Sequence, residues 1–216
     1  MRWDSVDVMG GCGARARWEA AGRPILPSLL VDGVATPVLH VSQIADALGL
    51  PWRPRLPPSA LARDTVVLLE TWLTGIAGLA LVELLAPTPS RGRSLRNLTV
   101  NVFHPFELLP AAWVEGSFPW DPDRDGQRES ALVDADALTA YARRTLERWS
   151  GFLDDVREDL DACDREVTSP RGRVSFAVLL DTQRWHAAYH LRQLAFAVKG
   201  VTPPALEQLA LPVDLF

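Results

Sequence analysis

The stretch that decides the fold is WHAAYHLRQL, residues 185–194, inside an apolar-periodic segment that spans residues 173–199. Gly200 and two prolines follow this segment and are typical helix stop signals, so the segment predicts one long helix. His186 and His190 are four residues apart and lie on one face of that helix, with their Cβ atoms about 6 Å apart. This spacing lets both imidazoles reach one metal ion at about 2.0–2.1 Å.

A third ligand must come from elsewhere, and the chain has only two other histidines, His40 and His104. His104 lies in a segment, residues 94–109, that predicts another helix able to face the first. Three protein ligands would leave a coordination position open, which is typical of catalytic metal sites. We therefore expect one divalent ion held by His104, His186 and His190, with Zn as the first candidate and Ni or Fe as alternatives. The other interpretation is that these histidines are solvated or form core hydrogen bonds.

Outward from these two segments, apolar residues recur at helical spacing along most of the C-terminal part of the chain. Four long helices predict an antiparallel four-helix bundle over residues 59–216, and the fold class is α+β, mostly α. The predicted helices are Ser59–Leu85, Ser94–Leu109 (bent or ended by Pro105), Ala135–Glu166 and Arg173–Lys199, with a loop over 114–130.

A proline-rich stretch at residues 51–59 interrupts the chain and predicts a linker. This linker separates a small N-terminal unit, residues 1–52, from the predicted bundle. The N-terminal unit has a β-α-β-β-α pattern. The predicted elements are a strand Ser5–Val8, a helix Ala14–Ala21, strands Ile25–Val31 and Pro37–Val41 around an Asp32-Gly33 turn, and a helix from the cap Ser42 to Gly49.

The bulk charge and composition exclude several classes of protein. The net charge is −5 and the pI is about 5.4, so no basic surface indicates nucleic acid or an anionic membrane as a partner. The longest apolar stretch, Thr71–Ala86, is too short to span a bilayer. Residues 1–4 show no signal-peptide pattern, and Cys12 and Cys163 form no CxxC pair. We therefore expect a reduced, cytoplasmic protein.

Residues 185–194 resemble the last-helix motif of the DinB/YfiT-like superfamily, in which an HxxxH is followed by an Arg-Gln or Gly-Gln element. The segment Ser94–Leu98 resembles the second-helix signature of the same superfamily. This resemblance covers roughly residues 60–200 and implies a four-helix bundle. It also implies a divalent metal held by one histidine of the second helix and two of the HxxxH. Members of the superfamily include thiol S-transferases and an isomerase that use low-molecular-weight thiols such as mycothiol.

The sequence departs from this pattern at one ligand. In our register the second-helix histidine of the superfamily falls on Asn101, and His104 lies three residues on, on the same helix face. Either His104 is the third ligand, or the site has two histidines with water or Asn101. The carboxylate of Glu107 is a further candidate.

The N-terminal unit resembles part of a glutaredoxin or thioredoxin-like fold. Residues 25–33 are similar to the cis-Pro strand and hairpin of that fold, and residues 41–50 to its last helix. The first strand, the CxxC and the first helix are missing, so thiol–disulfide exchange is not expected. Such a unit would supply a binding or dimerisation surface, or pack as a truncated remnant.

Two functions from different classes follow. The first is a metal-dependent thiol S-transferase or isomerase-like enzyme that acts on a small-molecule substrate with a low-molecular-weight thiol. The second is a non-catalytic protein with a degenerate site that binds a metal or small ligand, or forms a homodimer. Fold alone does not decide between them.

The remaining candidate residues have simpler interpretations. The acidic run containing Asp121, Asp123 and Asp125 fails the calcium-loop pattern and predicts a solvated loop. Trp72, Trp149 and Trp185 fall on predicted helices and are expected in the core. Trp113 and Trp120 flank the predicted loop and are expected to pack in the bundle; the alternative is that they line a pocket mouth near His104.

Overall fold

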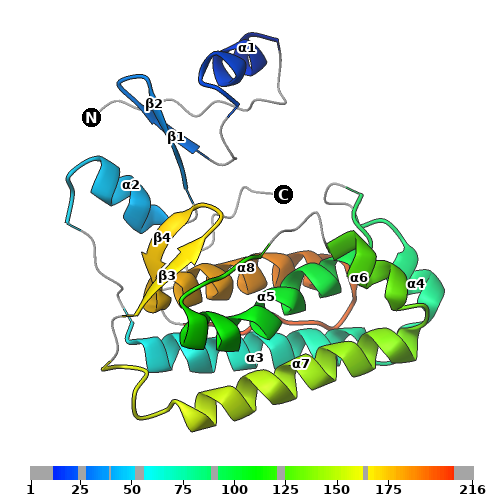
Figure 1. The fold of residues 1–216 in the computed structure, drawn as a ribbon. Helices are drawn as coiled ribbons and strands as arrows, with labels where there is room; N and C mark the ends of the chain where they lie inside the picture. Colours follow the sequence, from blue (N-terminus) through cyan, green and yellow to red (C-terminus); the bar gives the residue numbers. More distant parts are fainter. Residues whose placement is uncertain are drawn as a thin grey trace. The chain divides into compact units, whose positions relative to one another are not determined.

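A computed structural model of the chain describes residues 12–23, 28–38, 40–51, 56–88, 92–120, 125–162 and 165–206. Its contacts divide the chain into two compact units, Met1–Arg53 and Pro54–Phe216, here named the N-terminal and C-terminal units. The described residues are mostly helical with two small antiparallel sheets (Figure 1), which confirms the α+β, mostly α class. Residues 52–55 of the predicted linker lie outside the described ranges.

The N-terminal unit contains helix α1 (Cys12–Ala20) and a hairpin of β1 (Ser28–Val31) and β2 (Val34–Pro37). Asp32 and Gly33 have φ values of 49° and 83°, the left-handed conformation that a tight two-residue hairpin turn requires. Val31 pairs with Val34, so the second strand begins directly after the turn. The predicted strand Pro37–Val41 is therefore wrong, and the predicted strand Ser5–Val8 lies outside the described residues.

Helix α2 (Val41–Ala47) begins at a histidine cap instead of the predicted Ser42 cap. The Nδ1 of His40 accepts a hydrogen bond from the backbone N–H of Ser42 at 3.1 Å. The backbone N–H of His40 in turn donates to Oε1 of Gln43 at 3.1 Å. These reciprocal bonds satisfy donors that a helix start leaves open, so His40 has a local structural role.

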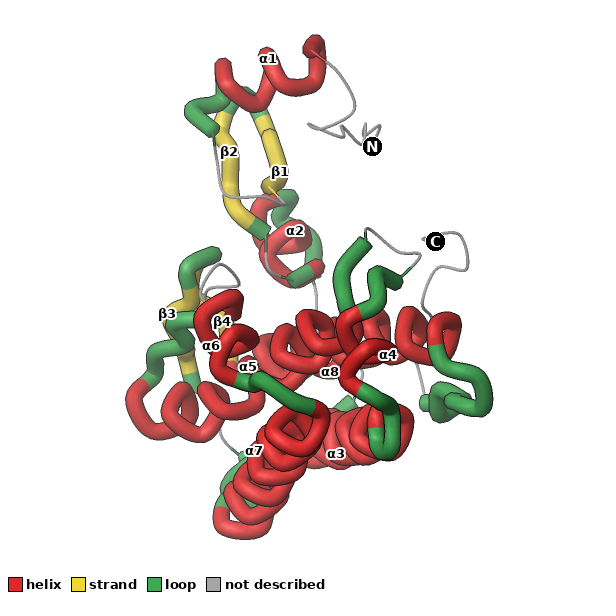
Figure 2. Tube along the Cα trace, turned by 90° about the vertical axis from the view of Figure 1, so that its right-hand side faces the viewer, coloured by secondary structure: helices red, strands yellow, loops and turns green. Residues whose placement is uncertain are grey.

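The C-terminal unit is built on four long helices, α3 (Pro58–Ile76), α5 (Leu95–Glu115), α7 (Ala135–Asp155) and α8 (Phe176–Ala197). They pack in the pairs α3–α8, α3–α7, α5–α7 and α5–α8, and Figure 2 shows α3 and α7 side by side below α5 and α8. Two short helices, α4 (Leu81–Leu85) and α6 (Asp125–Ala131), pack on α5. Across the ranges given above, none of the helices combines the length and apolar composition needed to cross a membrane.

Buried tryptophans connect these helices through side-chain hydrogen bonds. Trp72 of α3 donates from Nε1 to Oγ1 of Thr99 at 3.0 Å, and Trp149 of α7 donates to Oγ1 of Thr65 at 2.8 Å. Both rings are fully buried, as predicted. The prediction fails for Trp185, which is 42% exposed and stacks on Tyr189 with ring centroids 5.5 Å apart.

The predicted bounds of the first two long helices of this unit are wrong. The segment predicted as one helix, Ser59–Leu85, is two helices, because the chain turns between them at Gly78, whose φ is 83°. Helix α5 begins at the predicted Ser94 cap, whose hydroxyl accepts from the N–H of Asn97. It then continues through Pro105 to Glu115, because its buried apolar side chains hold the helix against α7 and α8 despite the missing proline donor.

A hairpin of β3 (Glu166–Ser169) and β4 (Gly172–Ser175) stands where the sequence predicted the end of one helix and the start of the next. Helix α7 ends at Asp155, and α8 begins after Ser175, whose hydroxyl accepts from the N–H of Val178. The hairpin is bonded to the chain that leaves α5. Phe118 donates its N–H to the carbonyl of Thr168 at 2.8 Å, and that residue donates to the carbonyl of Gly116 at 2.9 Å.

Candidate functional site

The two histidines of the HxxxH lie together on α8. The ring centroids of His186 and His190 are 4.6 Å apart and the rings are nearly perpendicular. His190 is buried, and its Nδ1 lies 2.6 Å from Oε1 of Gln193, one turn further along the helix. Because an amide oxygen only accepts hydrogen bonds, this contact puts the proton of a neutral His190 on Nδ1 and its lone pair on Nε2.

Helix α5 presents Asn101 to this pair. The Nε2 of His186 lies 3.1 Å from Oδ1 of Asn101, and that asparagine is buried. This contact likewise puts the proton of a neutral His186 on Nε2, so Nδ1 carries the lone pair. Asn101 is thus an α5 side chain that hydrogen bonds the HxxxH pair.

The third predicted ligand, His104, belongs to the same hydrogen-bonded chain but is reached through Asp125. Its Nδ1 lies 2.6 Å from one carboxylate oxygen of Asp125, and Asn101 donates from Nδ2 to the other oxygen at 3.1 Å. A continuous path therefore runs from His104 through Asp125 and Asn101 to His186.

Asp125 had been predicted in a solvated loop, and that prediction is wrong. It is 2% exposed, because it is the first residue of α6 and this helix packs on α5 beside Asn101 and His104. An acidic run that contains a glycine is typical of an exposed loop. The contact of α6 with α5 is what buries the Asp125 carboxylate. Asp121 and Asp123 lie outside the described residues.

Glu107, the other carboxylate considered as a ligand, is bound elsewhere. Its Oε2 accepts from Arg128 of α6 at 2.8 Å. Across the described ranges, no three His, Cys, Asp or Glu side chains are grouped closely enough to hold a metal ion. The structure thus brings His186 and His190 together and connects His104 to them through Asp125 and Asn101.

Two buried polar atoms in this centre have no hydrogen-bond partner among the described residues. They are Nδ1 of His186 and Nε1 of Trp120. The two rings are in contact, with centroids 5.3 Å apart. Trp120 therefore lies against His186 in this centre. A buried donor or acceptor without a partner costs free energy, so each marks a place where a ligand, ion or water would bind favourably.

Positive charge surrounds His186. Burial lowers the pKa of its imidazole well below the ordinary range, and His190, Arg93 and Arg171 lower it further through their own positive charge. The ring is therefore neutral at physiological pH, which is the form that binds metal ions.

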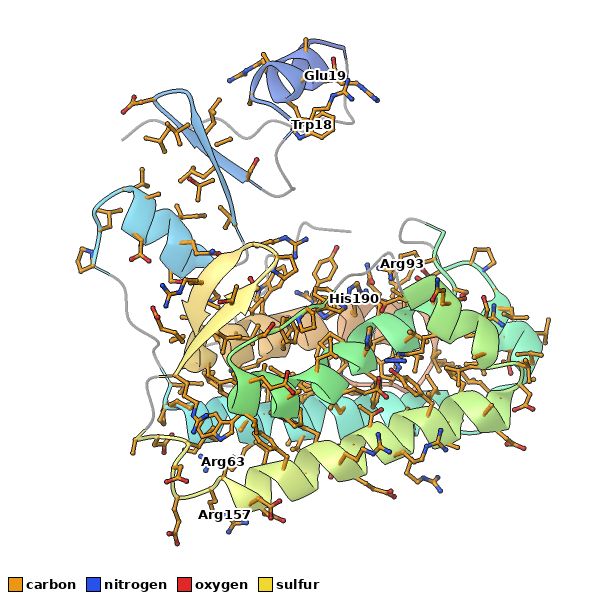
Figure 3. The ribbon with its side chains drawn as sticks, in the orientation of Figure 1. Trp18, Glu19, Arg63, Arg93, Arg157 and His190 are labelled. Carbon is orange, nitrogen blue, oxygen red and sulfur yellow. The ribbon has the colours of Figure 1, made fainter. Side chains whose placement is uncertain are left out.

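The two arginines come from different parts of the unit. Arg93 precedes α5, and its Nε donates to Oδ1 of Asn97 at 2.6 Å. Arg171 lies in the turn of the β3–β4 hairpin, where its backbone N–H donates to the hydroxyl of Ser169 at 3.1 Å. In Figure 3 the labelled side chains of Arg93 and His190 lie along one edge of the unit, away from Arg63 and Arg157.

The lowered pKa of His186 predicts a pH-dependent stability for the metal-free protein. Below about pH 6.5 the unfolded chain takes up a proton at this ring that the folded chain does not. Unfolding then binds protons, so the free energy of unfolding decreases as the pH falls, with a slope of up to about 1.4 kcal/mol per pH unit from this residue. Above about pH 6.5 the ring is neutral in both states and contributes no slope.

Urea unfolding between pH 7.5 and pH 5 would measure this effect, with His186→Gln as the comparison. We expect a shallower loss of stability in the variant than in the native chain. Equal slopes in the two proteins would contradict a lowered pKa at residue 186.

Several residues of the site were missed or underrated in the sequence analysis, namely Asp125, Gln193, Trp120, Arg93 and Arg171. Gln193 is three residues after His190, a spacing that signals a contact on a helix. Asp125 begins a short helix and the other three lie in loops or turns, so their relation to the histidines depends on how distant segments pack. Arg192, the neighbour of Gln193, carries no assigned role, and Cys163 and the side chain of Cys12 lie outside the described parts of the chain. Comparison of the chain with protein-family models, curated proteins and solved structures gives no match.

Proposed function

We propose that the C-terminal unit is a DinB-like antiparallel four-helix bundle that binds a divalent metal ion at His186 and His190. The observation that carries this proposal is the pair of adjacent imidazoles on α8, one of which has a buried ring nitrogen without a partner among the described residues. The closed set of packing pairs among α3, α5, α7 and α8 supports the bundle.

The donor set fits a metal ion chemically. His186, His190 and His104 each have one ring nitrogen beside an oxygen acceptor, from Asn101, Gln193 and Asp125 respectively. Metal-binding histidines usually donate their second N–H to such an acceptor, which fixes the tautomer and leaves the other nitrogen for the metal. The ligands would be His186 and His190, with His104 as the third from α5 and zinc as the first candidate.

Within this proposal the unit acts as a transferase or isomerase that uses a low-molecular-weight thiol such as mycothiol on a small electrophilic substrate. The bound metal would act as a Lewis acid that lowers the pKa of a thiol or water. The chain itself would hold His104 by Asp125 and His190 by Gln193 in fixed orientations. The burial of His186 would keep its imidazole in the neutral form that binds a metal ion.

A second function is favoured by Asn101, which bonds His186 where the superfamily pattern has a histidine. With that ligand replaced by an amide, the same centre is a degenerate site in a non-catalytic protein that binds a metal or small ligand. For the N-terminal unit, the hairpin followed by α2 supports a truncated thioredoxin-like piece without dithiol chemistry.

Metal content of the purified protein tests the proposed site. Mass spectrometry should find near-stoichiometric metal in the native protein and little in His186→Ala or His190→Ala. His40→Ala is the matched control, because this histidine caps α2 in the N-terminal unit and should leave metal content unchanged.

The remaining variants distinguish the two functions. Metal loss in His104→Ala supports the three-histidine site and the transferase, to be followed by a thiol-transfer assay. Metal retained in His104→Ala but lost in Asn101→Ala favours the degenerate site. A native protein without metal, even after reconstitution with zinc, would overturn the metal proposal.

A further inference from the structure

Trp120 brings a buried hydrogen-bond donor to the histidine pair. Its indole Nε1 has no acceptor among the described residues. An indole N–H only donates, so the group that satisfies it must offer a lone pair. Leaving such a donor unpaired in a buried environment costs free energy, so a molecule that supplies the acceptor binds there favourably.

The ring next to this indole carries the complementary group. The imidazole of His186 contacts the indole of Trp120, with ring centroids 5.3 Å apart and an angle of 62° between the ring planes. The Nε2 of His186 lies beside Oδ1 of Asn101, which leaves the lone pair on Nδ1. This Nδ1 is also buried without a partner among the described residues. An unpaired donor and an unpaired lone pair therefore lie on two rings in contact.

The β3–β4 hairpin holds the indole in this position. Two residues before Trp120, Phe118 is buried and donates its backbone N–H to the carbonyl of Thr168 at 2.8 Å. The N–H of Thr168 donates to the carbonyl of Gly116 at 2.9 Å. The ring of Phe118 also contacts that of Trp120, with centroids 6.4 Å apart. A donor fixed in this way is preorganised, which makes it effective at stabilising negative charge on a bound molecule.

The two unpaired nitrogens have different requirements. A metal ion satisfies the lone pair of His186, but it cannot accept a hydrogen bond from Trp120. A thiol sulfur held by that ion can accept one, because it has lone pairs of its own and is deprotonated on a metal. The two rings together therefore fit an ion and an electron-rich atom of the molecule bound to it. The competing interpretation is a single water or alcohol that bridges the two nitrogens.

We propose that Trp120 is a substrate-binding residue of this site, whose indole N–H donates a hydrogen bond to the sulfur of the thiol bound at His186 and His190. This assignment rests on the proposed function, and it adds a residue that contacts the bound molecule instead of the metal ion. A hydrogen-bond donor to sulfur stabilises its anionic form. Trp120 thus supports the form of the thiol that reacts with an electrophile.

The test is NMR of ¹⁵N-labelled, zinc-loaded full-length protein titrated with ethanethiol and read at the indole N–H of Trp120. The signal is assigned by its loss in Trp120→Phe, which keeps an aromatic ring. We expect a saturable shift of this signal. Ethanol differs from the probe only in having oxygen in place of sulfur, and it should leave the signal in place. In chelator-treated protein neither compound should move the signal.

The affinity for the same probe measures the hydrogen bond. In calorimetric titrations of zinc-loaded protein, ethanethiol should bind about tenfold more weakly to Trp120→Phe than to the native chain, because a charge-assisted hydrogen bond is lost. Zinc content should stay near-stoichiometric in this variant, since Trp120 is not a metal ligand. Trp185→Phe is the matched control, because this ring is 42% exposed on α8, and its affinity for ethanethiol should be native.

Unchanged affinity in Trp120→Phe, or an indole signal that does not move, would overturn the role of Trp120 and leave the metal function intact. An equal loss of affinity in Trp185→Phe would also overturn it. An equal shift with ethanol, or a shift in chelator-treated protein, would overturn it in favour of a bridging hydroxyl or water. A native protein that takes up no zinc would overturn both proposals, whereas zinc uptake without thiol binding would overturn the role of Trp120 and the thiol chemistry only.

Discussion

Replacing Trp149 by alanine is expected to lower the free energy of unfolding of the C-terminal unit by about 3–5 kcal/mol, as is usual for large-to-small changes in a core. The ring is fully buried. It packs edge-on against Phe106, with centroids 5.5 Å apart, and stacks on Phe152 at 5.4 Å. Its Nε1 also donates to Thr65 of α3. The variant therefore loses a contact at the junction of three helices, which urea unfolding followed by circular dichroism would measure.

Two further variants separate the causes. Trp149→Phe keeps most of the ring packing and loses the hydrogen bond, so we expect a smaller cost, about 1–2 kcal/mol. Trp185→Ala is the matched control on α8, because that ring is 42% exposed and should cost less than about 1 kcal/mol. A cost for Trp185→Ala as large as that for Trp149→Ala would contradict the packing described above.

Removing the Asp125 carboxylate is expected to have the second largest effect. In Asp125→Ala, His104 and the amide of Asn101 both lose their partner in a buried environment. An unsatisfied buried polar group costs about 1–3 kcal/mol, so the combined loss of stability is about 2–4 kcal/mol. If His104 is a ligand, metal affinity also falls about 10–100-fold, because the acceptor that orients the imidazole is gone.

Asp125→Asn and Asp136→Ala are the comparisons. The asparagine keeps one oxygen as an acceptor and should lie between the native protein and the alanine variant in both stability and metal affinity. Asp136 is an exposed carboxylate in the first turn of α7, so its alanine variant should stay close to native. Full stability in Asp125→Ala would contradict the shared hydrogen bonds.

The parts of the fold that the sequence predicts correctly depend on short-range chemistry. The Asp32-Gly33 turn forms because both residues accept a positive φ, and Ser94 caps α5 because its hydroxyl reaches an N–H three residues on. The adjacency of His186 and His190 is likewise a property of one helix. In each case the residues that decide the outcome are within a few positions of one another.

The helix ends that the sequence misplaces depend on contacts between distant segments or on one backbone angle. The apolar periodicity continues across Gly78, yet the helix ends before this residue. Helix α5, in contrast, continues through Pro105 because its buried side chains pack against neighbouring helices. The hairpin before α8 had an available signal, the alternation of residues around Pro170-Arg171. Its register against Gly116 and Phe118 had none, because those partners are some fifty residues away along the chain.

By itself the sequence determined a mostly helical chain with a small hairpin-containing N-terminal part, and it determined that two imidazoles share a helix face. Only the tertiary structure decided what meets them. It placed Asn101 on His186, buried Asp125 between His104 and that asparagine, and brought Trp120 into contact with the ring of His186. The physical reason is that helix periodicity and capping are set by neighbours along the chain. Hydrogen-bond partners and electric fields in a buried site are set instead by which elements pack together.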